Sequence, residues 1–458
     1  MLKHRPRIVS NCFVRLFFLG TIVFLCRDVP TEAAEAANPL SPKRLVTDNG
    51  MTVIVQEAHS LPVVNVQVIV KAGAVLDPDD KAGLANLTAD LLEEGTATRS
   101  ATQIADAVDF IGAGLSADGG EDYATASLRV LKKDVKTGMD LLSDILVHPS
   151  FPEPELQRKR QEIMGEIIAE KDQPGEVADK AFNQIVFGAN PYHRPTEGTE
   201  ETLPAITRAD VAQFYDQYYH PNNTIMTIVG DITESEALDL LKTYFGSWAR
   251  NPIPTVTIPP AVGLEKPVVK LINKDLTQAN IILGHLGIDR KNPDYYAVTV
   301  MNYILGGGGF SSRLMTNIRD NQGLAYSIDS HFEASAFPGS FTVSLQTRNA
   351  AAQLAIDGVL AELRKIRTAP VTDRELEDTK AFLIGSFPLR IDTSAKIAGL
   401  LAQIEFYNLG LDYVERYPKL IGSVTKTDVQ RVAQKYLDPD HLTLVVVAKQ
   451  DEAKIRQN

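Results

Sequence analysis

The sequence predicts an α+β protein of two homologous domains, each a largely antiparallel mixed sheet with helices packed on one face. The main observation is an internal repeat, in which residues 206–231 align with residues 424–449 at a constant offset of 218. Each copy predicts a helix that ends at an x-Pro-x turn and leads into a β-rich strand. A weaker repeat aligns two predicted strands, 65–73 and 278–286. A chain of 458 residues also exceeds the size of one hydrophobic core.

The other elements follow from local patterns. Apolar residues at helical spacing, broken by glycine or proline, predict helices, whereas short β-branched runs predict the opening strand of each domain. The predicted strands are 49–57 and 266–274, and the predicted helices are 83–95, 151–174, 295–307 and 371–387.

Residues 1–36 have the layout of a secretory signal peptide. A basic start leads into the apolar run 17–26, and Ala34 and Ala36 follow in an A-x-A arrangement. The apolar run is short for a membrane span, so we expect cleavage, with an uncleaved anchor as the alternative. After cleavage we expect no stable membrane association.

The mature chain divides into two domains joined by a linker. We expect an N-terminal domain over 40–252 and a C-terminal domain over 268–458. The segment 253–267 holds four prolines and few helix formers, which is typical of a linker.

Charge and cysteine content narrow the compartment and the partners. Both cysteines, Cys12 and Cys26, lie in the leader, so the mature chain has neither a disulfide nor a cysteine nucleophile. The net charge of −12 disfavours nucleic acid as a partner. An exported, acidic, cysteine-free chain with this leader predicts the periplasm of a Gram-negative bacterium.

The helix GLANLTADLLEEG places Asn86 and Asp90 four residues apart on one face. Pairs of metal ligands at this spacing build the sites of several zinc peptidases. Asn and Asp make a poor pair, because zinc prefers histidine nitrogen and cysteine sulfur. From the residues alone, a weak metal site, a lost site and an ordinary helix all stay open.

Three motifs stand out in the chain: GLANLTADLLEEGT, the helix through Glu166 followed by PYHRPTEGTEETL (191–203), and FSSRLMTNIRDNQGLAYSI (310–328). Together, over residues 45 to 450, they resemble the insulinase/pitrilysin/mitochondrial processing peptidase family of zinc peptidases. The resemblance implies a zinc helix with the motif H-x-x-E-H, in which two histidines bind zinc and the glutamate activates water. It also implies that the chain forms half of a clamshell of four homologous domains.

The same resemblance implies that this chain has lost its zinc site. Asn86 and Asp90 stand in place of the two histidines, and Ala89 stands in place of the catalytic glutamate. Glu166 matches the third ligand, whereas Lys159 replaces a supporting glutamate. We therefore expect no metal in this chain and zinc in a partner subunit.

The second half retains residues to which the family assigns substrate contacts. Arg319 and Tyr326 match a pair that binds substrate and stabilises the transition state. The alternative is a solvated helix arginine and a tyrosine that packs at a strand start. The four glycines Gly306, Gly307, Gly308 and Gly309 match a loop that touches substrate in non-catalytic subunits, and a simple turn explains them equally well.

We expect a zinc-less subunit of a heterodimeric metallopeptidase, inactive alone, whose partners are a peptide and a homologous chain with an intact H-x-x-E-H motif. Arg319 and Tyr326 would serve that partner's zinc site. One alternative is a non-enzymatic peptide-binding or assembly protein with the same fold. Another is a hydrolase that uses Asn86, Asp90 and Glu166 as unusual metal ligands.

Overall fold

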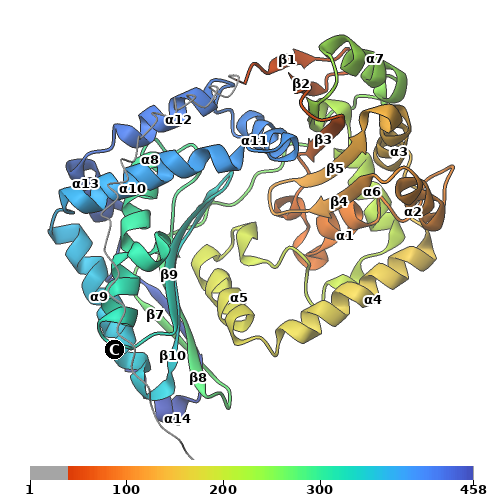
Figure 1. Cartoon of the computed structure of the whole chain (residues 1–458). Helices are drawn as coiled ribbons and strands as arrows, with labels where there is room; N and C mark the ends of the chain where they lie inside the picture. Colours follow the sequence, from red (N-terminus) through yellow and green to blue (C-terminus); the bar gives the residue numbers. More distant parts are fainter. Residues whose placement is uncertain (1–39, 457–458) are drawn as a thin grey trace, which may run out of the picture. The chain divides into compact units, whose positions relative to one another are not determined.

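The computed structural model describes residues 40–456, and within them the strands form two sheets (Figure 1). The first sheet contains β1 (Lys43–Val46), β2 (Thr52–Glu57), β3 (Val63–Val70), β4 (Gly114–Gly119), β5 (Ala124–Leu131) and β6 (Thr224–Gly230). The second contains β7 (Val268–Asn273), β8 (Gln278–Leu286), β9 (Ser327–Ala334), β10 (Pro338–Arg348) and β11 (Thr443–Ala448). The predicted opening strands and the strands of the weaker repeat correspond to β2, β7, β3 and β8.

The two sheets share one topology. Their strand orders are β1-β2-β6-β3-β5-β4 and β7-β11-β8-β10-β9. The five strands of the second sheet follow the same order along the chain as β2-β6-β3-β5-β4, and only β1 has no counterpart. In each sheet one pair is parallel, β2 with β6 and β7 with β11, and the other pairs are antiparallel. This agreement confirms the predicted fold class of two homologous, largely antiparallel mixed sheets.

Helices follow the strands in both halves. The first half contains α1 (Leu84–Asp90), α2 (Ala101–Phe110), α3 (Val135–Val147), α4 (Glu153–Glu170), α5 (Pro174–Phe187), α6 (Arg208–Tyr218) and α7 (Glu234–Phe245). The second contains α8 (Tyr295–Asn302), α9 (Ala352–Thr368), α10 (Asp373–Ser386), α11 (Ser394–Phe406), α12 (Tyr413–Gly422), α13 (Lys426–Tyr436) and α14 (Gln450–Ala453).

The repeat extends to the way its helices begin. Thr207 before α6 and Thr425 before α13 each accept a hydrogen bond from the backbone N–H of an aspartate three residues on, Asp210 or Asp428. Each aspartate in turn accepts a hydrogen bond from the backbone of its threonine. These reciprocal capping boxes satisfy first-turn N–H groups that a helix leaves without partners.

Two predicted helices are shorter than their apolar patterns suggested. The helix predicted at 83–95 ends at Asp90, and Leu91 and Leu92 remain buried in the turns that follow. The helix predicted at 295–307 ends at Asn302 and continues as a π-helical turn, Tyr303–Gly307. In both places burial continues beyond the helix, so the apolar periodicity does not mark its end.

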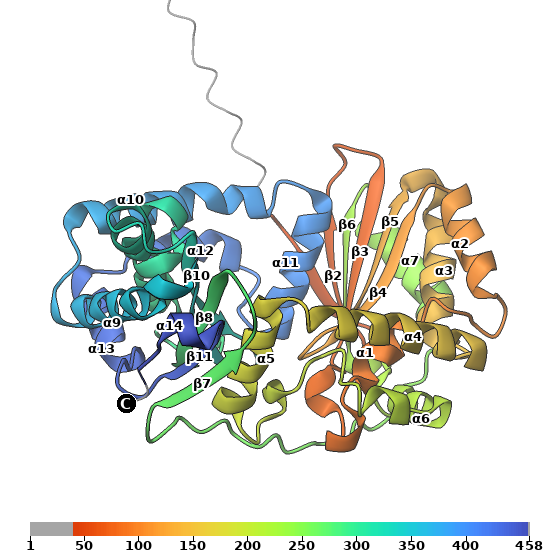
Figure 2. The ribbon, with the colours of Figure 1, turned by 90° about the horizontal axis from the view of Figure 1, so that it is seen from below.

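Each sheet also receives a helix from the other half of the chain (Figures 1 and 2). Helix α5 packs Phe182 against β8 and β11, where it meets Ile282 and Val445. Helix α11 packs Ala402 against Ile69 and Ile225 of β3 and β6. The two halves are therefore joined by buried apolar contacts as well as by the connecting chain.

Some predictions concern segments that the structure does not describe or describes without regular elements. The predicted signal peptide, 1–36, with Cys12 and Cys26, lies outside the described residues. Residues 251–264, in the proline-rich connection, have no regular secondary structure. No helix within residues 40–456 is both long enough and apolar enough to cross a membrane. The exact domain boundaries stay a prediction.

Candidate functional site

Helix α1 is fixed at its start by Asp77, a buried carboxylate. Its oxygens accept hydrogen bonds from the backbone N–H groups of Gly83, at 2.9 Å, and Ala85, at 2.8 Å. A carboxylate at this end satisfies unpaired N–H groups and complements the helix dipole. Burial raises the pKa of Asp77 to about 7. The fold therefore holds the start of α1 through its own hydrogen bonds.

Asn86 and Asp90 lie one turn apart on α1, as predicted, and contact each other. The Asn86 Nδ2 atom donates to the Asp90 carboxylate over 3.4 Å. Burial raises the pKa of Asp90 to about 6, although the nearby Lys159 ammonium acts in the opposite direction. Ala89 is fully buried and belongs to the core, and its methyl group cannot accept a proton. This face of α1 therefore carries no histidine, and the residue at the position of the family's catalytic glutamate cannot act as a base.

Helix α4 places Glu166 and Lys159 beside this face of α1. Burial is the main cause of the raised pKa of Asp90, and the negative charge of Glu166 adds a small contribution, so Glu166 lies near Asp90. The Lys159 Nζ atom lies 3.8 Å from the Glu94 carboxylate and 3.6 Å from that of Glu162. A lysine ammonium thus stands among the carboxylates.

This set of side chains does not fit a catalytic zinc ion. Zinc sites use histidine, cysteine and carboxylate ligands, whereas Asn86 turns an N–H donor toward Asp90 and Lys159 adds a positive charge nearby. Among residues 40–456, no group of three or more His, Cys, Asp or Glu side chains is arranged to hold a metal. The alternative of a hydrolase with Asn86, Asp90 and Glu166 as ligands therefore has no support in this geometry.

The structure brings Arg319 and Tyr326 together across a short turn. Arg319 lies in the last turn of a π-helical segment, Met315–Asp320, and its Nε atom donates to the Tyr326 backbone carbonyl oxygen over 3.0 Å. Its Nη1 atom forms an ion pair with Asp320 at 2.9 Å, and its guanidinium lies 5.5 Å from the centre of the Phe310 ring. Tyr326 directly precedes β9 and is 74% exposed, so its ring does not pack into the core.

The glycine segment is a tight turn before Phe310. A Cβ atom on Gly306 would lie 2.4 Å from the Ser330 hydroxyl oxygen, so β9 approaches too closely for any other residue. Gly307 and Gly308 pack similarly against Asn302 and Tyr303, and Gly309 has a positive φ of 55°. Close packing therefore accounts for Gly306, Gly307 and Gly308, and the positive φ accounts for Gly309, so their predicted contact with substrate stays a prediction.

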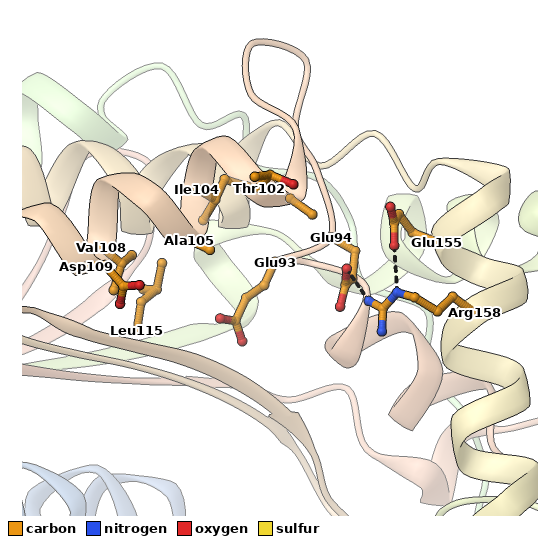
Figure 3. Close-up of a pocket in the computed structure, with 11 residues that line it drawn as sticks. Glu93, Glu94, Thr102, Ile104, Ala105, Val108, Asp109, Leu115, Glu155 and Arg158 are labelled. Carbon is orange, nitrogen blue, oxygen red and sulfur yellow. Dashed lines mark hydrogen bonds and ion pairs between the residues drawn. The ribbon is translucent and has the colours of Figure 1, made fainter.

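A cavity of about 590 Å³ beside the end of α1 was not predicted from the sequence (Figure 3). Its lining includes Glu93 and Glu94 after α1, Ala105 and Asp109 of α2, Leu115 of β4 and Arg158 of α4. The sequence feature that could have drawn attention to this cavity is the Glu-Glu pair directly after two buried leucines. The sequence does not reveal that α2 crosses this pair.

The two related sheets and the helices packed on them define an α+β protein of the peptidase type. Residues 52–200 match the family model "Insulinase (Peptidase family M16)", and residues 205–383 match "Peptidase M16 inactive domain". These matches cover more than half of the chain. The chain belongs to peptidase family M16, the insulinase family, which confirms the resemblance inferred from the motifs.

Solved structures and curated relatives agree with this assignment. The crystal structure of a peptidase M16 inactive domain from Pseudomonas fluorescens is 30% identical and has a TM-score of 0.84, covering 89% of this chain and 98% of that one. A protease from Helicobacter pylori has the same fold, with 22% identity, a TM-score of 0.83 and coverage of 89% and 99%. The "uncharacterized zinc protease YmxG" of Bacillus subtilis is 28% identical over 77% of this chain and 85% of its own length.

Proposed function

We propose that this chain is the zinc-less subunit of a two-chain metallopeptidase that hydrolyses peptides. The observation that carries the proposal is a contrast between two places in the molecule. On α1 the ligand and base positions hold Asn86, Ala89 and Asp90. In the second half, the Arg319 side chain donates a hydrogen bond to the backbone carbonyl of Tyr326, and the tyrosine ring is exposed to solvent.

The chemistry of the pair suits substrate binding. The hydrogen bond from Arg319 Nε to the Tyr326 carbonyl orients the guanidinium and leaves Nη2 for a peptide carbonyl or carboxylate. The exposed Tyr326 hydroxyl is free to donate to the oxyanion that forms when a peptide bond is attacked. Zinc in the partner subunit would activate the attacking water.

The partner proposed for this chain is a homologous chain with an intact H-x-x-E-H motif. Several relatives are named zinc proteases, which supports zinc chemistry within the family. The proposed location of the complex is the periplasm, because the leader predicts export. The peptide would be extended, since edge strands recognise extended chains through main-chain hydrogen bonds.

The test uses the complex of this chain with its zinc-bearing homologue. The two chains are co-expressed and co-purified, zinc is measured in each separated chain, and cleavage of a fluorogenic peptide is followed. We expect zinc in the partner alone and cleavage by the complex alone. If no homologous chain binds, the non-enzymatic peptide-binding or assembly function is favoured instead.

Point variants then test the role of the pair. Removing one oxyanion donor costs about 10²- to 10³-fold in kcat, so Tyr326→Phe should lower kcat by about this factor. Arg319→Ala should mainly raise KM, because it removes a binding contact. Arg374→Ala, which changes an exposed arginine of α10, is the control and should leave both constants unchanged. Full activity of both Arg319→Ala and Tyr326→Phe would refute the proposal.

A further inference from the structure

We propose that Phe310 is a positioning residue, whose aromatic ring holds the Arg319 guanidinium in the orientation in which it receives a peptide. The proposal rests on the proposed function and adds a residue that acts through the arginine. It concerns the segment 306–326 of the second half, which begins with the glycine turn and ends at Tyr326.

The Phe310 ring is largely in solvent although it is large and apolar. It is 76% exposed, and Gly309 before it has a positive φ of 55°, so the chain reaches this residue through a left-handed turn. Within residues 40–456 the three most exposed aromatic side chains are those of Phe110, Phe310 and Tyr326. Two of these three residues contact Arg319. Core packing therefore does not explain Phe310.

The Arg319 guanidinium is held by two polar contacts that water can disrupt. Its Nε atom donates to the Tyr326 backbone carbonyl over 3.0 Å, and its Nη1 atom pairs with Asp320 at 2.9 Å. The ion pair is open to water, since 36% of the Arg319 side chain and 46% of the Asp320 side chain are exposed. Exposed ion pairs contribute little, so these contacts alone fix the guanidinium only loosely.

The Phe310 ring supplies a contact for which water does not compete in the same way. The central carbon of the guanidinium lies 5.5 Å from the ring centre, within the distance of about 6 Å at which a ring face attracts a cation. Arginine also stacks on aromatic faces through its flat guanidinium. The ring therefore shields one side of the Arg319 head while the two polar contacts set its direction.

The backbone keeps Phe310 and Arg319 at a fixed separation. Three residues after Phe310, Arg313 binds the Glu375 carboxylate of α10 through Nε at 2.6 Å and Nη2 at 3.0 Å. Next to Arg319, Ile318 is 0% exposed and belongs to the core of the second half. Both positions are therefore anchored, and the ring and the guanidinium meet without ordering a free loop.

A guanidinium that is already oriented loses less rotamer entropy when a peptide binds. The Nη2 atom has no hydrogen-bond partner within residues 40–456, so it is the atom that the orientation presents to a peptide. A cation–π contact at an exposed site corresponds to about a two- to fivefold change in an equilibrium constant. Loss of the ring should therefore weaken peptide binding by about this factor.

The first test uses the full mature chain without any partner. Nuclear magnetic resonance on isotope-labelled arginine follows exchange of the Arg319 Nε–H with water, and Arg319→Lys identifies the resonance by its absence. Phe310→Leu keeps an apolar side chain without a ring, so we expect exchange to be about two- to fivefold faster. Phe310→Tyr, which keeps the ring, and Phe110→Leu, an exposed control in α2, should leave the rate unchanged. An unchanged rate in Phe310→Leu, or an equal rise in Phe110→Leu, would overturn the proposal.

The second test measures peptide cleavage by the complex with the zinc-bearing chain. Phe310→Leu should raise KM about two- to fivefold with kcat unchanged, and Phe310→Tyr should restore the parent KM. In an Arg319→Ala background, Phe310→Leu should add nothing, because the ring acts through the arginine. A further rise in KM in that background would show that the ring contacts the peptide directly and would refute the positioning role. Failure to form an active complex refutes only the proposed function, since the exchange measurement needs no partner.

Discussion

Tyr192→Phe should destabilise the protein more than an ordinary buried tyrosine variant. Tyr192 is 3% exposed, and its hydroxyl donates to the Asp122 carboxylate over 2.5 Å. The same hydroxyl accepts a weaker hydrogen bond from the Phe337 N–H at 3.3 Å, and Asp122 also accepts one from the Ala336 N–H at 2.9 Å. Tyr192 and Asp122 belong to the first half, whereas residues 336 and 337 belong to the second, so this cluster links the halves.

The magnitude follows from the kind of bond that is lost. A hydrogen bond to a charged acceptor contributes about 1.5–3 kcal/mol, and the buried carboxylate and amide lose a partner, so we expect a loss of about 3 kcal/mol in the free energy of unfolding. Tyr215→Phe is the matched comparison, because the Tyr215 hydroxyl donates to a neutral carbonyl, that of Leu146, over 2.8 Å. Its expected loss is about 1 kcal/mol.

Urea unfolding, followed by circular dichroism, measures both losses from the shift in midpoint and a common slope. Near-equal shifts for Tyr192→Phe and Tyr215→Phe would show that the charge of Asp122 adds nothing to this bond. A loss below about 1 kcal/mol for Tyr192→Phe would refute the assigned geometry.

Three further predictions concern buried charge, the altered α1 face and the glycine turn. Burial, with the charges of Glu333 and Asp122, raises the pKa of Glu121 to about 8 from 4.5, so folding takes up a proton between these values and stability falls as pH rises. Glu121→Gln should therefore match the parent at pH 5 and exceed its stability by about 2–4 kcal/mol above pH 8 in urea titrations; equal stabilities at both pH values would contradict this. The triple variant Asn86→His, Ala89→Glu and Asp90→His should bind zinc more weakly than a variant that also carries Lys159→Glu. Calorimetry measures both zinc affinities, and equal affinities would exclude an effect of the lysine charge. Gly306→Ala should cost about 2 kcal/mol because its Cβ would meet the Ser330 backbone N at 2.7 Å, and an unchanged melting temperature would show that β9 yields.

Local sequence patterns predicted about half of the elements within the described residues, because their side chains repeat with the period of the element. The strand β8 and the repeated helices α6 and α13 lie where the two internal repeats placed them. The end of α1 was missed because Leu91 and Leu92 continue the apolar pattern although they lie in turns. A helix boundary depends on where the chain must turn to meet other elements, and this information is tertiary.

The candidate site likewise contains features that the sequence predicts and features that depend on tertiary structure. The i, i+4 pair of Asn86 and Asp90 follows from helix geometry alone, whereas the nearness of Glu166 to Asp90 followed only from the family resemblance. The cavity at Glu93 followed from neither, because it forms where α2, β4 and the end of α1 converge. Glu93 and Asp109 of its lining form no ion pair within the described residues, and only the structure reveals this.

Core packing explains why α1 forms whatever residues its polar face carries. Ala85, Leu87 and Leu91 are each 0% exposed, and truncating one such leucine costs about 2–5 kcal/mol, so the core requires the helix whatever its polar face carries. Polar changes on that face leave these contacts intact, which separates zinc binding from folding. Tyr326 presents the opposite case, since a ring that is 74% exposed contributes little to the core and folding does not require it. Stability therefore does not explain Tyr326, and the Tyr326→Phe measurement tests directly whether the proposed function in substrate binding does.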